Sequence, residues 1–144
     1  MAGSDVRPNI ILAAVVTVTI LFGLGPGTLW AFVGGITANL LTTDPLGTLP
    51  LGLLLVAALT AGAASVFGRS GLVVAFLGGA LGSVILDTTA LLVVMLLGGA
   101  PPVDASALIG LMAPTAILNG LLTTIVWIVA RAVVARIGSQ PALA

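Results

Sequence analysis

Asp87 is the one ionisable side chain that falls deep inside a long apolar segment of this chain. Catalysis within a membrane needs a nucleophile with a base, a pair of carboxylates, or a metal ion. The sequence contains no His, Lys or Cys, so a nucleophile has no base beside it and zinc lacks its nitrogen and sulfur ligands. An aspartyl dyad would need a second carboxylate at the same depth. We therefore predict a protein that is not an enzyme and that uses no metal or cofactor.

The position of Asp87 is costly, because a carboxylate at the centre of a membrane helix costs about 2.5 to 3.5 kcal/mol on insertion scales. We expect its side chain to face the interior of a helix bundle. The favoured interpretation is a structural cluster, because a proton or cation relay usually needs several titratable groups in line. The alternatives are such a relay or a contact with another subunit. The hydroxyl and amide partners available for the cluster are Thr88, Thr89, Asn119 and Thr123.

Other candidate positions concern the packing of helices. Asn39 and Asn119 are expected either to bridge helices, at roughly 0.6 kcal/mol per hydrogen bond, or to line a ligand cavity, and bridging is favoured. Trp30 and Trp127 are candidate anchors at the membrane interface. Small residues permit close approach of helices, and the candidates for this role are Gly34, Gly35, Gly78 and Gly82.

The composition identifies the environment in which these residues must be placed. Hydrophobic residues make up 60% of the 144 residues and charged residues only 6%, and the mean hydropathy is +1.36. Soluble domains carry about 25% charged residues, so a water-facing surface cannot be built from this sequence. The four Arg and four Asp cancel, which leaves no basic surface for nucleic acid. We predict an integral membrane protein.

Segment lengths predict an all-α, polytopic transmembrane bundle, formed as a single domain over residues 1–144. A spanning helix needs about 20 apolar residues, and Gly- and Pro-rich breakers, among them the turn motif of Asp44, Pro45 and Gly47, divide the chain. The second segment is short, so it could instead form a re-entrant hairpin with the first. Pro114 is expected to separate a short interfacial turn from the last span. The five predicted spans are 8–24, 28–43, 49–67, 72–97 and 107–134.

Arginine placement predicts the orientation, because cytoplasmic loops are enriched in basic residues. With five spans, Arg69, Arg131 and Arg136 share one side of the membrane and Arg7 lies on the other. The carboxyl terminus is therefore expected in the cytoplasm and the amino terminus outside. This odd topology would follow if a six-helix ancestor had lost its first helix.

The order of features resembles the family of the rod shape-determining protein MreD. The resemblance rests on a Pro-led apolar helix, a Gly-containing helix that leads into Pro-Leu-Gly47, and a final helix with Pro114 and Asn119 followed by a basic tail. Asp87 lies about where the family carries an acidic residue. Asn39 stands where the family has an acid near the end of its Gly-containing helix, and the family's first helix has no counterpart here.

The resemblance implies a non-enzymatic subunit of the bacterial plasma membrane that serves cell elongation. Such a protein binds the bitopic protein MreC and, through it, associates with RodA, its partner transpeptidase and MreB filaments, which organises lateral peptidoglycan synthesis and maintains rod shape. The alternative function is a small-solute transporter component, similar to the substrate-capturing subunits of vitamin uptake, whose fold MreD resembles. That alternative requires a pocket with several convergent polar groups.

Overall fold

The computed structural model describes residues 8–43, 45–68, 71–99 and 105–138 of the chain. The described residues form helices and connecting turns, with no strand. The helices nearly coincide with the five segments expected from apolar length. They are α1 (Ile10–Phe22), α2 (Leu24–Leu40), α3 (Thr48–Phe67), α4 (Leu72–Leu96) and α5 (Ala105–Gly138).

Polar and flexible residues mark the helix ends. The Asn9 side chain accepts a hydrogen bond from the backbone N–H of Leu12 at 2.9 Å and so caps the start of α1. Gly23 has a φ of 96°, which an L side chain rarely adopts, and it is the one residue between α1 and α2. Gly47, with a φ of 96°, precedes α3 in the same way. Gly23 lets the chain reverse within a single residue, and Gly47 ends the longer connection that leads into α3.

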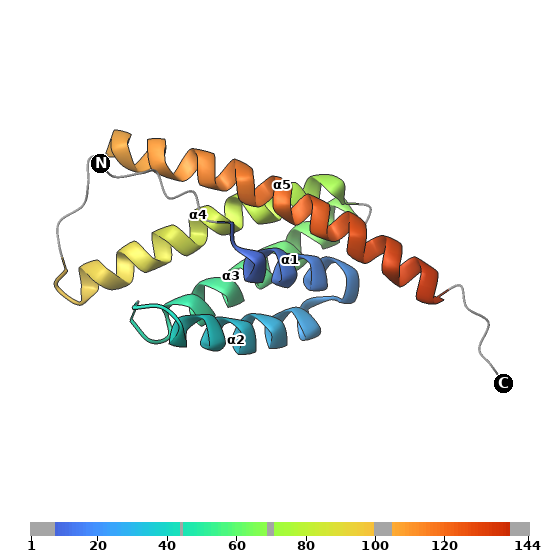
Figure 1. Ribbon diagram of the computed structural model, residues 1–144, viewed down its shortest axis with the longest axis horizontal. Helices are drawn as coiled ribbons and strands as arrows, with labels where there is room; N and C mark the ends of the chain where they lie inside the picture. The colour runs from blue at the N-terminus through green and yellow to red at the C-terminus, as the bar shows by residue number, and fades with distance from the viewer. Residues whose placement is uncertain (1–7, 44, 69–70, 100–104, 139–144) are drawn as a thin grey trace.

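The shortest helix lies at the centre of the bundle. Figure 1 shows α1 between the α4–α5 pair and the α2–α3 pair, and α1 contacts all four other helices. More than half of its 13 residues are buried, and these buried residues are Leu12, Ala13, Val15, Val16, Thr17, Thr19 and Ile20.

Among the described residues, three helices are long and apolar enough to cross a membrane, fewer than the five that we expected. They are α3, α4 and the part of α5 from Met112 to Gly138. The expectation fails for α1 and α2, which have 13 and 17 residues. At 1.5 Å per residue they measure roughly 20 and 26 Å, short of a hydrocarbon core of about 30 Å.

The expected division of the last segment at Pro114 is also wrong, because α5 continues through Pro114 as one helix of 34 residues. A proline removes one N–H donor from the helix ladder, here the partner of the Gly110 carbonyl. Pro114 is exposed on the bundle, and the residues on both sides of it remain helical.

Candidate functional site

Asn119 joins three helices at the centre of the bundle. Its side chain is 2% exposed. The Oδ1 atom accepts a hydrogen bond from the backbone N–H of Asn9 at 2.8 Å, and Nδ2 donates one to Oγ of Ser83 at 3.0 Å. Asn119 therefore connects α5 to the start of α1 and to α4, which is the bridging arrangement that the sequence favoured over a ligand cavity.

The backbones of α4 and α5 approach each other closely around this joint, the hydrogen bonds of Asn119 to Asn9 and Ser83. The fully buried Thr123 donates its hydroxyl to the Asn119 carbonyl at 2.7 Å. On α4, a Cβ atom added at Gly79 would lie 2.6 Å from that same carbonyl oxygen, so the two helices touch there. The neighbouring Gly78 and Gly82 face α1 and α3 instead, where an added Cβ would lie 2.8 Å from side-chain atoms of α1 in each case.

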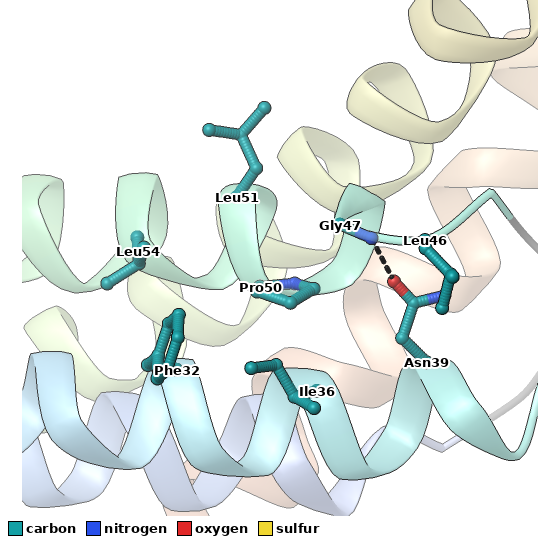
Figure 2. Close-up of a pocket in the computed structure, with 8 residues that line it drawn as sticks. All are labelled: Phe32, Ile36, Asn39, Leu46, Gly47, Pro50, Leu51 and Leu54. Atoms are coloured by element: carbon teal, nitrogen blue, oxygen red, sulfur yellow. Dashed lines mark hydrogen bonds between the residues drawn. The ribbon is translucent and has the colours of Figure 1, made fainter.

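Asn39 stabilises the turn between α2 and α3. The buried side chain accepts a hydrogen bond through Oδ1 from the backbone N–H of Gly47 at 2.8 Å, as Figure 2 shows. Thr48, the first residue of α3, donates its hydroxyl to the Pro45 carbonyl at 2.8 Å. The structure thus brings Asn39 together with Gly47 of the predicted turn motif, and Pro45 of the same motif binds Thr48. The third, Asp44, lies outside the described residues.

An apolar groove of about 480 Å³ opens beside this turn between α2 and α3. Next to the groove α2 and α3 approach closely, because a Cβ at Gly35 would lie 2.6 Å from Cα of Pro50, whereas Gly34 faces Ile11 of α1. Asn39 is the one polar side chain in the lining, and its Oδ1 is engaged with the turn. A groove so lined offers few convergent polar groups, so it lends the transporter alternative no support. The lining consists of Phe32, Ile36, Asn39, Leu46, Gly47, Pro50, Leu51 and Leu54.

Asp87 is exposed, so the expectation that it lies buried in the bundle interior is wrong. Asp87 and Thr88 are both exposed on α4, and Thr89 donates its hydroxyl to the Ile85 carbonyl of its own helix at 2.7 Å. The buried polar cluster exists, but Ser83, one turn before Asp87, takes the place of the carboxyl in it.

Two members of that cluster, Asn9 and Ser83, were not among the predicted site residues. Asn9 carried a signal, because an Asn directly before an apolar run is a favoured helix cap. Ser83 carried a weaker one, since it extends the run of small residues at Gly78, Gly79 and Gly82 along one side of α4.

The two tryptophans differ in their surroundings. Trp30 is 53% exposed, as an interface anchor would be, whereas Trp127 is only 3% exposed, so the anchor expected there is wrong. The guanidinium carbon of Arg131 lies 5.2 Å from the centroid of the Trp127 ring, within reach of a cation–π contact. Trp127 therefore belongs to the core of the bundle, and Arg131 lies over it one turn further along α5.

The described part of the chain brings together no three His, Cys, Asp or Glu side chains that could hold a metal ion. The sites that it does contain are a buried joint at Asn119, a stabilised turn at Asn39, and an exposed polar pair on α4. No family model matches the chain, and no curated protein and no solved structure is significantly similar to it.

Proposed function

We propose that this chain is a non-enzymatic membrane subunit that binds a transmembrane helix of a partner protein. The observation that carries the proposal is the exposure of Asp87 and Thr88 on α4, within a helix apolar enough to span a membrane. Polar side chains that face lipid raise the free energy of the protein. A partner helix with a hydrogen-bond donor at that depth would lower it.

The depth of Asp87 follows from its place in α4. It lies nine residues before the last residue of this 25-residue helix, about 14 Å along the axis. Because α4, at roughly 38 Å, exceeds the hydrocarbon core by about 8 Å, Asp87 lies roughly 10 Å inside the apolar layer when the two ends share the excess equally. Val94 follows Asp87 by seven residues and therefore lies on the same face of α4, where it is an exposed apolar side chain at 36%. A partner helix would therefore meet a polar spot within an apolar surface.

The finer proposal names the partner as the bitopic protein MreC and the process as bacterial cell elongation in the plasma membrane. Its support is the order of sequence features shared with the MreD family, including an acidic residue near the position of Asp87. In this role the chain would link MreC to RodA, its partner transpeptidase and MreB, with its carboxyl terminus in the cytoplasm.

The test is co-purification of the full chain with MreC from membranes in which both are expressed. We expect Asp87→Leu to reduce the recovered MreC at least tenfold. The variant should still fold, because it removes a carboxylate from lipid. Thr37→Leu is the matched control, since Thr37 is an exposed polar residue on α2, and it should leave recovery unchanged.

Equal recovery of MreC with Asp87→Leu and with the parent would refute the partner-binding surface. The elongation role has a separate test: deletion of the gene from a rod-shaped host should give rounded cells. Cells that remain rods after deletion would refute that role even if a partner helix binds at Asp87.

A further inference from the structure

Two buried polar atoms have no hydrogen-bond partner among the described residues. They are Oγ1 of Thr17 and Nε1 of Trp127. Thr17 is 4% exposed and Trp127 is 3% exposed. An unsatisfied buried polar group raises the free energy of the folded protein. The other buried threonine of α1, Thr19, avoids this cost by donating to the Val15 carbonyl at 2.7 Å.

The two atoms lie on two different helices, Thr17 on α1 and Trp127 on α5. These helices touch, and Figure 1 shows them running in the same direction. The hydrogen bond between Asn9 and Asn119 fixes their register at one end. Thr17 and Trp127 each follow eight residues later, about 12 Å along the axis. They therefore lie at the same level of the bundle.

Thr17 shares a helix face with Asn9, and Trp127 shares one with Asn119. Ala13 and Thr17 follow Asn9 at intervals of four residues, and Thr123 and Trp127 follow Asn119 at the same interval, so each set lies along one face. All four of these following residues are buried. Thr17 therefore lies on the face of α1 that begins at the hydrogen bond between Asn9 and Asn119, and Trp127 lies on the face of α5 that begins at the same bond.

We propose that Thr17 and Trp127 form a buried binding site for one small hydroxylic molecule, which is water in the resting protein. An indole N–H can only donate, whereas a hydroxyl can donate and accept. A molecule that accepts from Trp127 and exchanges a hydrogen bond with Thr17 satisfies both atoms, and buried waters commonly serve this purpose. The cation–π contact with Arg131 holds the indole ring in place. The site does not depend on the proposed partner binding.

The experiment observes the indole proton of Trp127 in the full chain in micelles. Trp30→Phe leaves Trp127 as the one tryptophan of the chain, since there are two in all. In this background we expect a magnetisation-transfer cross-peak between the indole N–H and water, and an indole Raman band typical of a hydrogen-bonded N–H. Thr17→Val, which keeps the side-chain shape, should abolish the cross-peak and shift the band to that of a free N–H.

Thr19→Val is the matched control, because Thr19 is equally buried in α1 but bonds to its own helix. It should leave both signals unchanged, and Thr17→Ser should restore them. A free indole N–H in the Trp30→Phe background would overturn the proposal. A hydrogen-bonded indole without a water cross-peak would overturn it too, because it would indicate a direct bond to Thr17. Retention of both signals in Thr17→Val would remove Thr17 from the site.

Discussion

The helices α1 and α5 are both strongly apolar, yet the bundle buries them in opposite ways. α1 has 13 residues, is surrounded by the other four helices, and buries residues around most of its circumference. α5 has 34 residues and a single narrow buried stripe, while Leu121, Ile125 and Val129 are between 51% and 60% exposed. The buried stripe of α5 consists of Asn119, Gly120, Thr123 and Trp127.

The difference shows what selects a buried face when the solvent is lipid. Lipid tails are as apolar as Leu, so burial of apolar side chains gives little drive for helix association, and close packing and hydrogen bonds decide instead. In α5 the inward stripe carries Asn119 and Thr123, and the outward face carries large aliphatic residues. In α1 the shape of the neighbours decides, since the glycines of α2 and α4 let it approach closely.

The largest expected effect concerns how far α1 and α5 extend across the membrane. The chain contains no Cys, so single cysteines can be placed at Gly25, beside the α1–α2 junction, and at Gly138, where each side chain has open space. Because α1 is about 10 Å too short to span, we expect Gly25→Cys to resist impermeant maleimide from both sides until the membrane is dissolved. Gly138→Cys should react fully from one side.

Labelling of Gly25→Cys from the same side as Gly138→Cys would contradict a re-entrant hairpin formed by α1 and α2. It would instead support the topology with five spans. Both topologies return the chain to the starting side before α3, so they predict the same relative placement of the two termini.

The second prediction compares equal truncations in the two helices. Leu12→Ala removes a side chain that is fully buried in α1, and we expect a loss of about 2 to 5 kcal/mol in unfolding free energy from the cavity that it leaves. Leu121→Ala removes one that is 51% exposed on α5, and its loss should be under about 0.5 kcal/mol. Reversible unfolding in mixed micelles measures both. Equal losses would mean that α1 is not the centre of the bundle.

The smallest expected effect concerns the joint that connects the two helices. Asn119→Leu breaks the hydrogen bonds to Asn9 and Ser83, and we expect a loss of about 1 kcal/mol, from two bonds of roughly 0.6 kcal/mol each. Adding Ser83→Ala should cost little more, which a double-mutant cycle would show as coupling. Thr124→Val, whose hydroxyl bonds to its own helix at Gly120, is the control. If the losses of Asn119→Leu and Ser83→Ala were additive, the two side chains would not be coupled and the bridge to Ser83 would be refuted.

Helix positions could be predicted from the sequence because breakers mark them. Gly23, Gly47, Gly68 and Gly98 all adopt positive φ, and each lies at or next to a helix end that the apolar segments had suggested. Crossing the membrane is a different property, which depends on length, and Gly23, which ends α1, leaves that helix too short to span. Apolar length alone therefore located the helices but overcounted the spans.

The faces of the helices could not be predicted, because helices that are apolar all round carry no periodic signal. Asp87 was assigned to the interior on cost alone, yet Ser83, one turn away, takes that position against Asn119. Trp127 was assigned to the interface by residue type, yet its place on the stripe with Asn119 and Thr123 buries it. Asn119 was the more informative residue, since a buried amide needs partners from other helices.

Pro114 makes the long helix α5 easier to bend at one point, although the helix is continuous there. Proline has no N–H, so the hydrogen-bond ladder lacks the rung that would join residue 114 to the Gly110 carbonyl. The segment before Pro114 is therefore tied to the rest of α5 by fewer bonds and can bend at a lower energetic cost than an intact stretch of helix. Any force applied to the α4–α5 connection would thus be absorbed near Pro114, about 7 Å along the axis before the Asn119 joint, and would leave the three-helix junction undisturbed.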